Sequence, residues 1–389
     1  FMTRVLGLHH VTAIGGDAQR LLDFHTGVLG LRLVKRTVNF DDPTGYHFYF
    51  GDATGAPGAL LTLFPWGDAP RGRVGTGQAA VTALSIPPAS LGFWLDRFAA
   101  LGVRHELPAR RFRDAERDAR GADDGGETVV AFEDPDGLRL ELATDPRVAA
   151  LPGWEGAPGI PAEHAIRGLF GVTLWVEDAD AAGTFLADAF GMRRAATEGA
   201  VTRWVADAAP DAAPDDAPND APNAAPGGAL DAEVAPALGR VVDVRDARGF
   251  WTGAMGVGAV HHVAFRARDG EAQAALKRRV MEAGIPTTPV RDRHYFASVY
   301  FRAPGGVLYE LATDGPGFAV DEPLDALGAA LRLPPAFEGE RAAIERALPP
   351  VTYPPRPPAA GAPVATSAAA SAAAFAGAHA DAAGAEVLP

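Results

Sequence analysis

The stretches Gly7-Leu-His-His-Val-Thr12 and Ala259-Val-His-His-Val-Ala264 are near copies of each other, although most of the chain separates them. Both have the pattern of short strands, and a further strand, Leu308-Tyr-Glu-Leu311, follows the second copy. Two imidazoles and one carboxylate presented by strands form the ligand set of a 2-His-1-carboxylate metal site. Neighbours on a strand point to opposite faces, so one histidine of each pair can face the metal. We predict that an Fe(II) ion that activates dioxygen is held by His10, His262 and Glu310.

The two stretches belong to a fourfold repeat. Aligning Val11, Val81, Val172 and Val263 shows four units, each with a strand, an amphipathic helix closed by glycine, and two or three further strands. The predicted first strands are residues 9–14, 79–86, 169–176 and 260–265, and the predicted helices begin near Asp17 or cover residues 91–101, 181–190 and 271–283, closed by Gly30, Gly102, Gly191 and Gly284. Counting from the histidine slot to this glycine gives 20, 22, 20 and 22 residues. The alternation indicates a two-unit ancestor that was itself duplicated.

This repeat predicts an α+β fold in which four βαβββ units form two similar domains. We expect an N-terminal domain at residues 4–148, a linker at 149–164 and a C-terminal domain at 165–320. Residues 206–238 are acidic and rich in proline and alanine, so we expect an insertion within unit three that does not order itself. Residues 321–389 form a C-terminal extension that is expected to be disordered after about residue 349.

The other units act as an internal control for the metal site. The histidine slot is taken by Ala80 and Gly171 in units two and three, and the glutamate slot by Leu63 and Glu141 in units one and two. The complete ligand set therefore occurs only where unit one meets unit four. Because Leu63 supplies no fourth ligand, up to three positions of an octahedral metal stay free for substrate and dioxygen. This favours oxygen activation over Lewis-acid isomerisation, and Glu141 is interpreted as a relic or a structural carboxylate.

Several other polar side chains have two interpretations each. His9 and His261 either border the pocket or support the ligands from behind. Arg293 could bind an anionic substrate oxygen and Tyr300 could donate a hydrogen bond to a bound oxygen species, or both could belong to an ordinary hairpin. The remaining histidines lack partners at ligand spacing and are interpreted as structural or surface residues: His25, His47, His105, His164 and His379.

Composition narrows the class of protein. The absence of cysteine excludes disulfides, zinc-thiolate sites, iron-sulfur clusters and thiol nucleophiles. A net charge of -14 argues against nucleic acid and anionic membrane surfaces as partners. The sequence contains neither an apolar run of the roughly 18 residues that a membrane span needs nor a signal-peptide pattern. A cytoplasmic location is the resulting expectation.

The quoted strands and several further motifs resemble one superfamily. The unit with His on a first strand and Glu on a last one resembles the vicinal oxygen chelate superfamily of glyoxalase, bleomycin-resistance and extradiol dioxygenase proteins. Within it, ring-cleaving dioxygenases that open hydroquinones are similar in the motifs Gly7 to Gln19, Val34 to Asn39, Pro57-Gly58, Phe64-Pro65-Trp66 and Val260 to Phe265. The resemblance implies cupped mixed or antiparallel sheets and a non-haem Fe(II) enzyme that cleaves a small aromatic substrate with O2. It implies the metal ligands His10, His262 and Glu310 and the pocket residues His9, Thr12, His261, Arg293 and Tyr300.

Two rival functions on the same fold stay open at this point. One is a metal-dependent isomerase or lyase, and the other is a protein that sequesters an aromatic compound without turnover. The sequence also leaves open hydroquinone or catechol as substrate, Fe(II) or Mn(II) as metal, and whether the chain forms a homo-oligomer.

Overall fold

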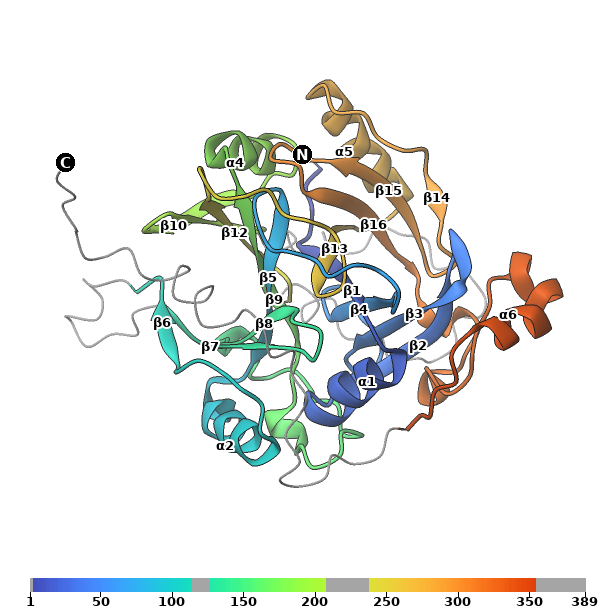
Figure 1. Ribbon diagram of the computed structural model, residues 1–389. Helices are drawn as coiled ribbons and strands as arrows, with labels where there is room; N and C mark the ends of the chain where they lie inside the picture. The colour runs from blue at the N-terminus through green and yellow to red at the C-terminus, as the bar shows by residue number, and fades with distance from the viewer. Residues whose placement is uncertain (1–2, 114–125, 208–237, 355–389) are drawn as a thin grey trace, which may run out of the picture.

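Two eight-stranded sheets make up the framework of the protein (Figure 1). The structure is a computed structural model and describes residues 3–113, 126–207 and 238–354. In spatial order the first sheet consists of β14 (Arg291–Asp292), β15 (Phe296–Arg302), β16 (Leu308–Pro316), β13 (Ala259–Ala267), β1 (Leu8–Gly15), β4 (Leu60–Pro65), β3 (Asp42–Gly51) and β2 (Arg32–Asn39). The second consists of β10 (Arg193–Glu198), β11 (Val201–Val205), β12 (Val241–Asp246), β9 (Gly168–Val176), β5 (Gln78–Ile86), β8 (Arg139–Thr144), β7 (Glu127–Glu133) and β6 (Ala109–Arg111).

One helix follows the first strand of each unit, as the repeat predicts. The four helices are α1 (Ala18–Leu22), which continues into a wider π-helical stretch at Asp23–Val28, α2 (Leu91–Leu101), α4 (Ala179–Asp188) and α5 (Gly270–Glu282). Asp17 caps α1 by accepting a hydrogen bond from the backbone N–H of Arg20. The predicted closing glycines all have φ between +67° and +78°, a conformation that favours glycine. The predicted α+β fold with first strands, helices and closing glycines is therefore confirmed.

The four units combine in an order that the sequence did not reveal. Unit one pairs with unit four in the first sheet, and unit two pairs with unit three in the second. Figure 1 shows this as blue strands beside orange ones and teal strands beside green ones. Each sheet therefore takes strands from both halves of the chain. The boundaries expected for an N-terminal domain at residues 4–148 and a C-terminal domain at 165–320 stay a prediction.

The two faces of the first sheet have different roles. Val11, Val263 and Leu311 point to one face and join a large hydrophobic core that includes the buried side chains of all four helices. The opposite, concave face carries the histidine and glutamate side chains of the quoted strands. Strand alternation thus separates the structural face from the chemical one.

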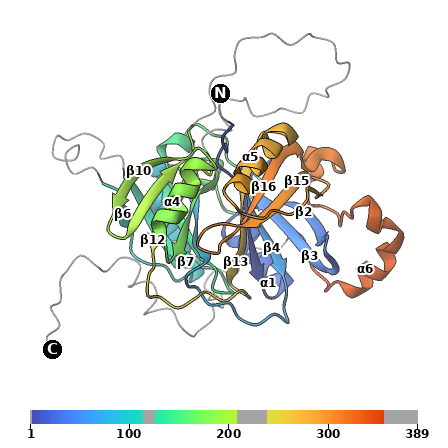
Figure 2. The same cartoon turned by 90° about the horizontal axis from the view of Figure 1, so that it is seen from above.

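The C-terminal extension fills one end of this concave face. Leu327 of the extension and Phe318 just before it pack there with Tyr49 and Phe296 in a second hydrophobic cluster. Farther along, α6 (Arg341–Ala347) lies beside β3 at the outer edge of the first sheet (Figure 2). Most of the predicted insertion at 206–238 lies outside the described residues. Disorder was predicted after about residue 349, but the structure describes the chain to residue 354, with Val351 and Tyr353 packed against the core, and the rest of the tail lies outside the described residues. None of the helices in the described ranges is long and apolar enough to cross a membrane.

Gly171 shows why unit three lacks a histidine at the repeated slot. A Cβ atom at this position would lie 2.3 Å from the backbone oxygen of Val241 on the neighbouring strand β12. We expect Gly171→Ala to lower the free energy of unfolding by about 1–3 kcal/mol, because the backbone must move to admit the methyl group. Gly92→Ala in α2 is the matched control, since nothing lies within 4 Å of a Cβ there. Equal losses in the two variants in urea titrations would contradict this explanation.

Candidate metal centre

The register of the central strands brings the three predicted ligands together. Strands β1 and β13 pair antiparallel, so that His10 lies opposite Ala264. Ala264 in turn lies beside Glu310 on the parallel strand β16. His262 lies diagonally across the same strand pair, opposite Thr12. The three side chains therefore meet on the concave face at the junction of units one and four.

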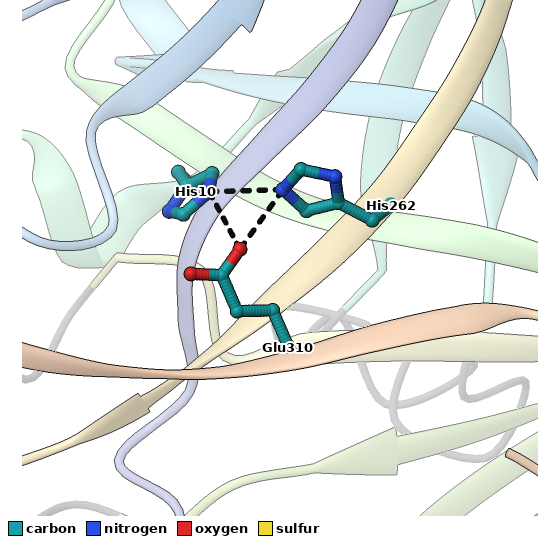
Figure 3. Close-up of side chains that lie close together, drawn as sticks. All are labelled: His10, His262 and Glu310. Atoms are coloured by element: carbon teal, nitrogen blue, oxygen red, sulfur yellow. Dashed lines mark hydrogen bonds and ion pairs between the residues drawn. The ribbon is translucent and has the colours of Figure 1, made fainter. Parts of the chain in front are cut away.

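The ligand atoms of these residues converge on a common point (Figure 3). His262 Nε2 lies 2.9 Å and His10 Nε2 lies 3.3 Å from Glu310 Oε2, and the two Nε2 atoms are 3.3 Å apart. Ligands about 2.1 Å from one ion and at right angles to each other are about 3.0 Å apart. The three atoms thus have the spacing of one face of an octahedron, as in a facial triad. Within the described residues they form the one cluster of three or more His, Cys, Asp or Glu side chains with this compactness.

The environment of the triad fits a cation. Glu310 Oε2 is buried and has no hydrogen-bond partner in the described part of the chain, although His262 Nε2 lies 2.9 Å from it. Burial alone would raise the pKa of Glu310, but the imidazoles of His10 and His262 hold it well below its ordinary range. Burial lowers the pKa of His262. A carboxylate beside neutral imidazole is the protonation state that metal ligation requires.

Each ligand histidine contacts the histidine before it. The Nδ1 atoms of His9 and His10 are 2.9 Å apart, and those of His261 and His262 are 2.8 Å apart. Burial lowers the pKa of His9 well below its ordinary value and that of His261 to about 3. One nitrogen of each contact must therefore carry the proton and the other must accept it. On the far side of the triad, Ser298 Oγ donates a hydrogen bond to Glu310 Oε1.

A pocket opens beside the triad. Its lining includes His10 and His262, and the other lining residues are Asn39, Phe40, Asp41, His47, Tyr49, Phe64, Arg293, Phe296 and Tyr300. Of the pocket residues implied by the resemblance, Arg293 and Tyr300 line this space, whereas His9, Thr12 and His261 are not among its described lining residues. The predicted roles of these five residues stay predictions.

Asp41 joins units one and four at the pocket mouth. Its carboxylate accepts hydrogen bonds from Arg293 Nη2 at 2.8 Å and Arg291 Nη1 at 3.1 Å. Arg293 Nε also lies 3.3 Å from the hydroxyl of Tyr300. Asp41 was missed in the sequence because it lies in the turn between β2 and β3, far along the chain from Arg293. Arg293 does lie in a hairpin, between β14 and β15, but only 15% of its side chain is exposed.

Comparison with known proteins agrees with the fold. A sequence model of the Glyoxalase/Bleomycin resistance protein/Dioxygenase superfamily matches residues 7–142 and 168–311. The chain belongs to this superfamily. The "Putative ring-cleaving dioxygenase MhqO" of Bacillus subtilis (strain 168) is 38% identical over 89% of this chain and 96% of its own length. The "Chlorohydroquinone/hydroquinone 1,2-dioxygenase" of Sphingobium indicum is 31% identical over 89% of this chain and 96% of its own.

A solved structure supports the same assignment. The crystal structure of a "putative dioxygenase" from Bacillus subtilis subsp. subtilis str. 168 superposes with a TM-score of 0.75 and is 37% identical. The similarity covers 90% of this chain and 98% of that one. The resemblance inferred from the sequence motifs is therefore confirmed.

The strand register corrects the residue that we assigned to the glutamate slot of unit one. The row His262, Thr12, Thr62 and Tyr49 across four strands mirrors the row His10, Ala264, Glu310 and Tyr300. Thr62 therefore occupies the position equivalent to Glu310, and Leu63 points into the hydrophobic core instead. The prediction that unit one supplies no carboxylate is unchanged. The residue named was wrong by one position, which places it on the opposite face of the strand.

Arginine side chains fill the equivalent place in the second sheet. There the two histidine positions are taken by Gly171 and by Val81, instead of the expected Ala80. The two glutamate positions are taken by Glu141 and, in unit three, by Asp243. Arg111 binds both carboxylate oxygens of Glu141 at 3.2 and 2.9 Å, and Arg203 bridges Asp243 and Glu127 at 2.7–2.8 Å. These guanidinium groups neutralise the carboxylates and take up the space, so Glu141 has a structural role.

The remaining histidines divide into two groups. His47 is buried and lines the pocket, so it is not a surface residue. His25 and His105 contact backbone oxygens and His164 contacts Ser90, as structural histidines do. His379 lies outside the described residues. The signal for His47 was present in Tyr46-His-Phe-Tyr-Phe50, where alternation sends His47 and Tyr49 to the face opposite Phe48 and Phe50.

Proposed function

We propose that this protein is an Fe(II)-dependent, extradiol-type ring-cleaving dioxygenase that opens a hydroquinone-like aromatic substrate with O2. The observation that carries the proposal is the compact, buried triad of His10, His262 and Glu310 beside a pocket with aromatic walls. The names of the relatives MhqO and chlorohydroquinone/hydroquinone 1,2-dioxygenase support the reaction class. Mn(II) has similar ligand preferences and is the alternative metal.

The three residues would hold the ion through His10 Nε2, His262 Nε2 and Glu310 Oε2. The chemistry that Fe(II) supplies when bound is to lower the pKa of a phenol and to bring dioxygen beside it. Thr62 at the fourth equivalent position offers a hydroxyl that already contacts Thr12 at 2.8 Å and His47 at 2.8 Å. A set of three protein ligands leaves room for two reactants, which is what a dioxygenase needs.

The residues around the pocket would orient the substrate and handle protons. Burial and the charge of Glu310 raise the pKa of Tyr300, so its hydroxyl keeps a proton that it can donate. Arg293 supplies a fixed positive charge next to that hydroxyl, and Asp41 holds the guanidinium in place. Together they would stabilise negative charge that develops on substrate oxygens during ring opening.

His9 and His261 would fix the tautomers of the two ligand histidines. When Nε2 of His10 or His262 binds a metal, Nδ1 carries the proton and donates it to Nδ1 of the preceding histidine. This arrangement also sets the direction of each ring. His9 and His261 thereby act on the metal through its ligands.

Oxygen uptake tests the proposed activity directly. We expect protein loaded anaerobically with Fe(II) to consume O2 with methylhydroquinone and to give a ring-opened product that contains both atoms of 18O2, as measured by mass spectrometry. Metal-free protein is the control for autoxidation, which yields quinone without incorporated oxygen. Stoichiometric metal with no uptake for methylhydroquinone or catechol would rule out the dioxygenase and favour an isomerase or a sequestering protein.

A further inference from the structure

We propose that His47 selects substrates that carry a second hydroxyl across the ring from the hydroxyl that faces the triad, by hydrogen-bonding this second hydroxyl through Nδ1. The inference rests on the proposed function, because it concerns the substrate of the same site. It makes His47 a specificity-determining residue that separates para-diols from ortho-diols and monophenols.

Packing holds the imidazole of His47 in one orientation. Its ring centroid lies 4.0 Å from that of Tyr49 and 4.3 Å from that of Phe64, and all three rings line the pocket. Only 8% of the residue is exposed. Because the ring is packed on both sides, its nitrogen atoms point in fixed directions. A residue that discriminates between substrates by their shape needs such a fixed orientation.

One of the two ring nitrogens is left for a ligand. Nε2 lies 2.8 Å from Thr62 Oγ1, which in turn lies 2.8 Å from Thr12 Oγ1. Nδ1 has no hydrogen-bond partner in the described part of the chain, and it is not among the fully enclosed atoms that lack one. A polar atom that is unpaired yet reachable on the wall of a pocket is suited to bind a polar group of the ligand.

The charge state of His47 suits a neutral hydroxyl. Burial holds the pKa of His47 well below its ordinary value, and the nearby His10 and His262 lower it further. A neutral imidazole can donate or accept at Nδ1, according to how the hydroxyls of Thr62 and Thr12 point. It can therefore pair with a phenol in either direction without burying a new charge.

The position of His47 matches a ligand about one aromatic ring long. Strand β4 separates β3 from β1, and the register puts His47 level with Ile14, four residues along β1 from His10. The backbones that carry His47 and His10 are therefore about 10 Å apart across the sheet and about 13 Å apart along the strands. Both side chains project over the concave face, which shortens the gap between them. A ring held at the triad by one hydroxyl would direct a group in the para position toward His47, whereas an ortho group would stay beside the triad.

The repeat gives an independent reason to assign His47 to the substrate. The mirrored rows make Tyr49 equivalent to Tyr300, so His47 is equivalent to Ser298, two residues earlier. Ser298 Oγ supports the ligand Glu310, whereas His47 contacts Thr62, which is not a carboxylate. The side chain at position 47 therefore does not support a metal ligand. It is larger than that of Ser298 and reaches the pocket.

Equilibrium binding of hydroquinone and phenol, measured anaerobically on Fe(II)-loaded protein by calorimetry, tests the inference. The second hydroxyl should make hydroquinone bind about 10-fold more tightly than phenol to the wild type, the worth of one hydrogen bond. His47→Gln keeps a polar group near the Nε2 position but has none at the Nδ1 position. It should reduce the ratio of the affinities for hydroquinone and phenol to about one. His47→Asn places its amide near the Nδ1 position and should retain most of the preference. His25→Gln, which changes a buried histidine outside the pocket, should leave the ratio unchanged.

Equal affinity of the wild type for the two ligands, or an undiminished preference in His47→Gln, would overturn the inference. Oxygen uptake by the same samples separates this result from the proposed function. Ring opening with equal affinities would refute the role of His47 alone. The opposite result is also possible: the preference for hydroquinone is lost in His47→Gln, but the wild type consumes no oxygen. This would support the role of His47 in binding and refute the dioxygenase activity.

Discussion

Replacing Glu310 with glutamine is expected to abolish tight metal binding and ring cleavage together. Glutamine has almost the same shape, but it removes the negative charge that faces the two imidazoles and puts an amide in the fully buried site. Changes to groups that only support ligands cost about 10–100-fold in metal affinity, and loss of the sole charged ligand should cost more. Metal content per chain after Fe(II) loading, together with oxygen uptake, measures both effects.

Glu141→Gln is the matched control for this prediction. Glu141 has the equivalent place in the second sheet, is similarly buried and contacts Arg111 instead of histidine. Its substitution should weaken folding through the loss of an ion pair while one metal ion still binds per chain. Equal metal content in Glu310→Gln and wild type would show that the triad is not the metal site.

The local structure of this protein could be predicted well because its signals lie within short segments. The alternation around His9 and His10 marked a strand, Asp17 marked a helix start, and Gly102 or Gly284 marked helix ends. The convergence of His10, His262 and Glu310 also followed from the sequence, because the fourfold repeat showed which units lack histidine at the repeated position. Each of these signals is found within one unit or by comparing the four units with each other.

The arrangement between units was harder to predict because it depends on strand register. A shift of one residue exchanges the two faces of a strand, and this is why Leu63 was named where Thr62 lies. The same limit hid Asp243 in unit three, whose partner Arg203 comes from an adjacent strand. The sequence of a single unit does not indicate that unit one pairs with unit four, because this pairing depends on how the units pack against each other.

A buried charge cluster that ties the C-terminal extension to the first sheet gives the largest expected effect on stability. Lys35 Nζ lies 2.6 Å from Asp321 Oδ1 and 2.5 Å from Glu322 Oε2, and the Lys35 side chain is fully buried. Tyr295 donates a hydrogen bond to the other oxygen of Asp321 at 3.0 Å. The cluster therefore also anchors the loop that carries Arg293. We expect Lys35→Met to lower the free energy of unfolding by about 3–5 kcal/mol, because it removes the buried ammonium group beside the buried Glu322 and the half-buried Asp321 and leaves Glu322 only the more distant Arg332 at 3.3 Å.

Urea unfolding followed by circular dichroism measures this loss, and two further variants identify its origin. Arg341→Met removes a cation whose contacts with Glu338 and Glu345 are partly exposed, so it should cost less than about 1 kcal/mol. The triple variant Lys35→Met, Asp321→Asn, Glu322→Gln keeps the shape of the cluster without its charges. It should recover much of the stability, because the main cost in Lys35→Met is the unpaired buried charge. A triple variant less stable than Lys35→Met would instead show that the charged contacts themselves hold the extension on the sheet.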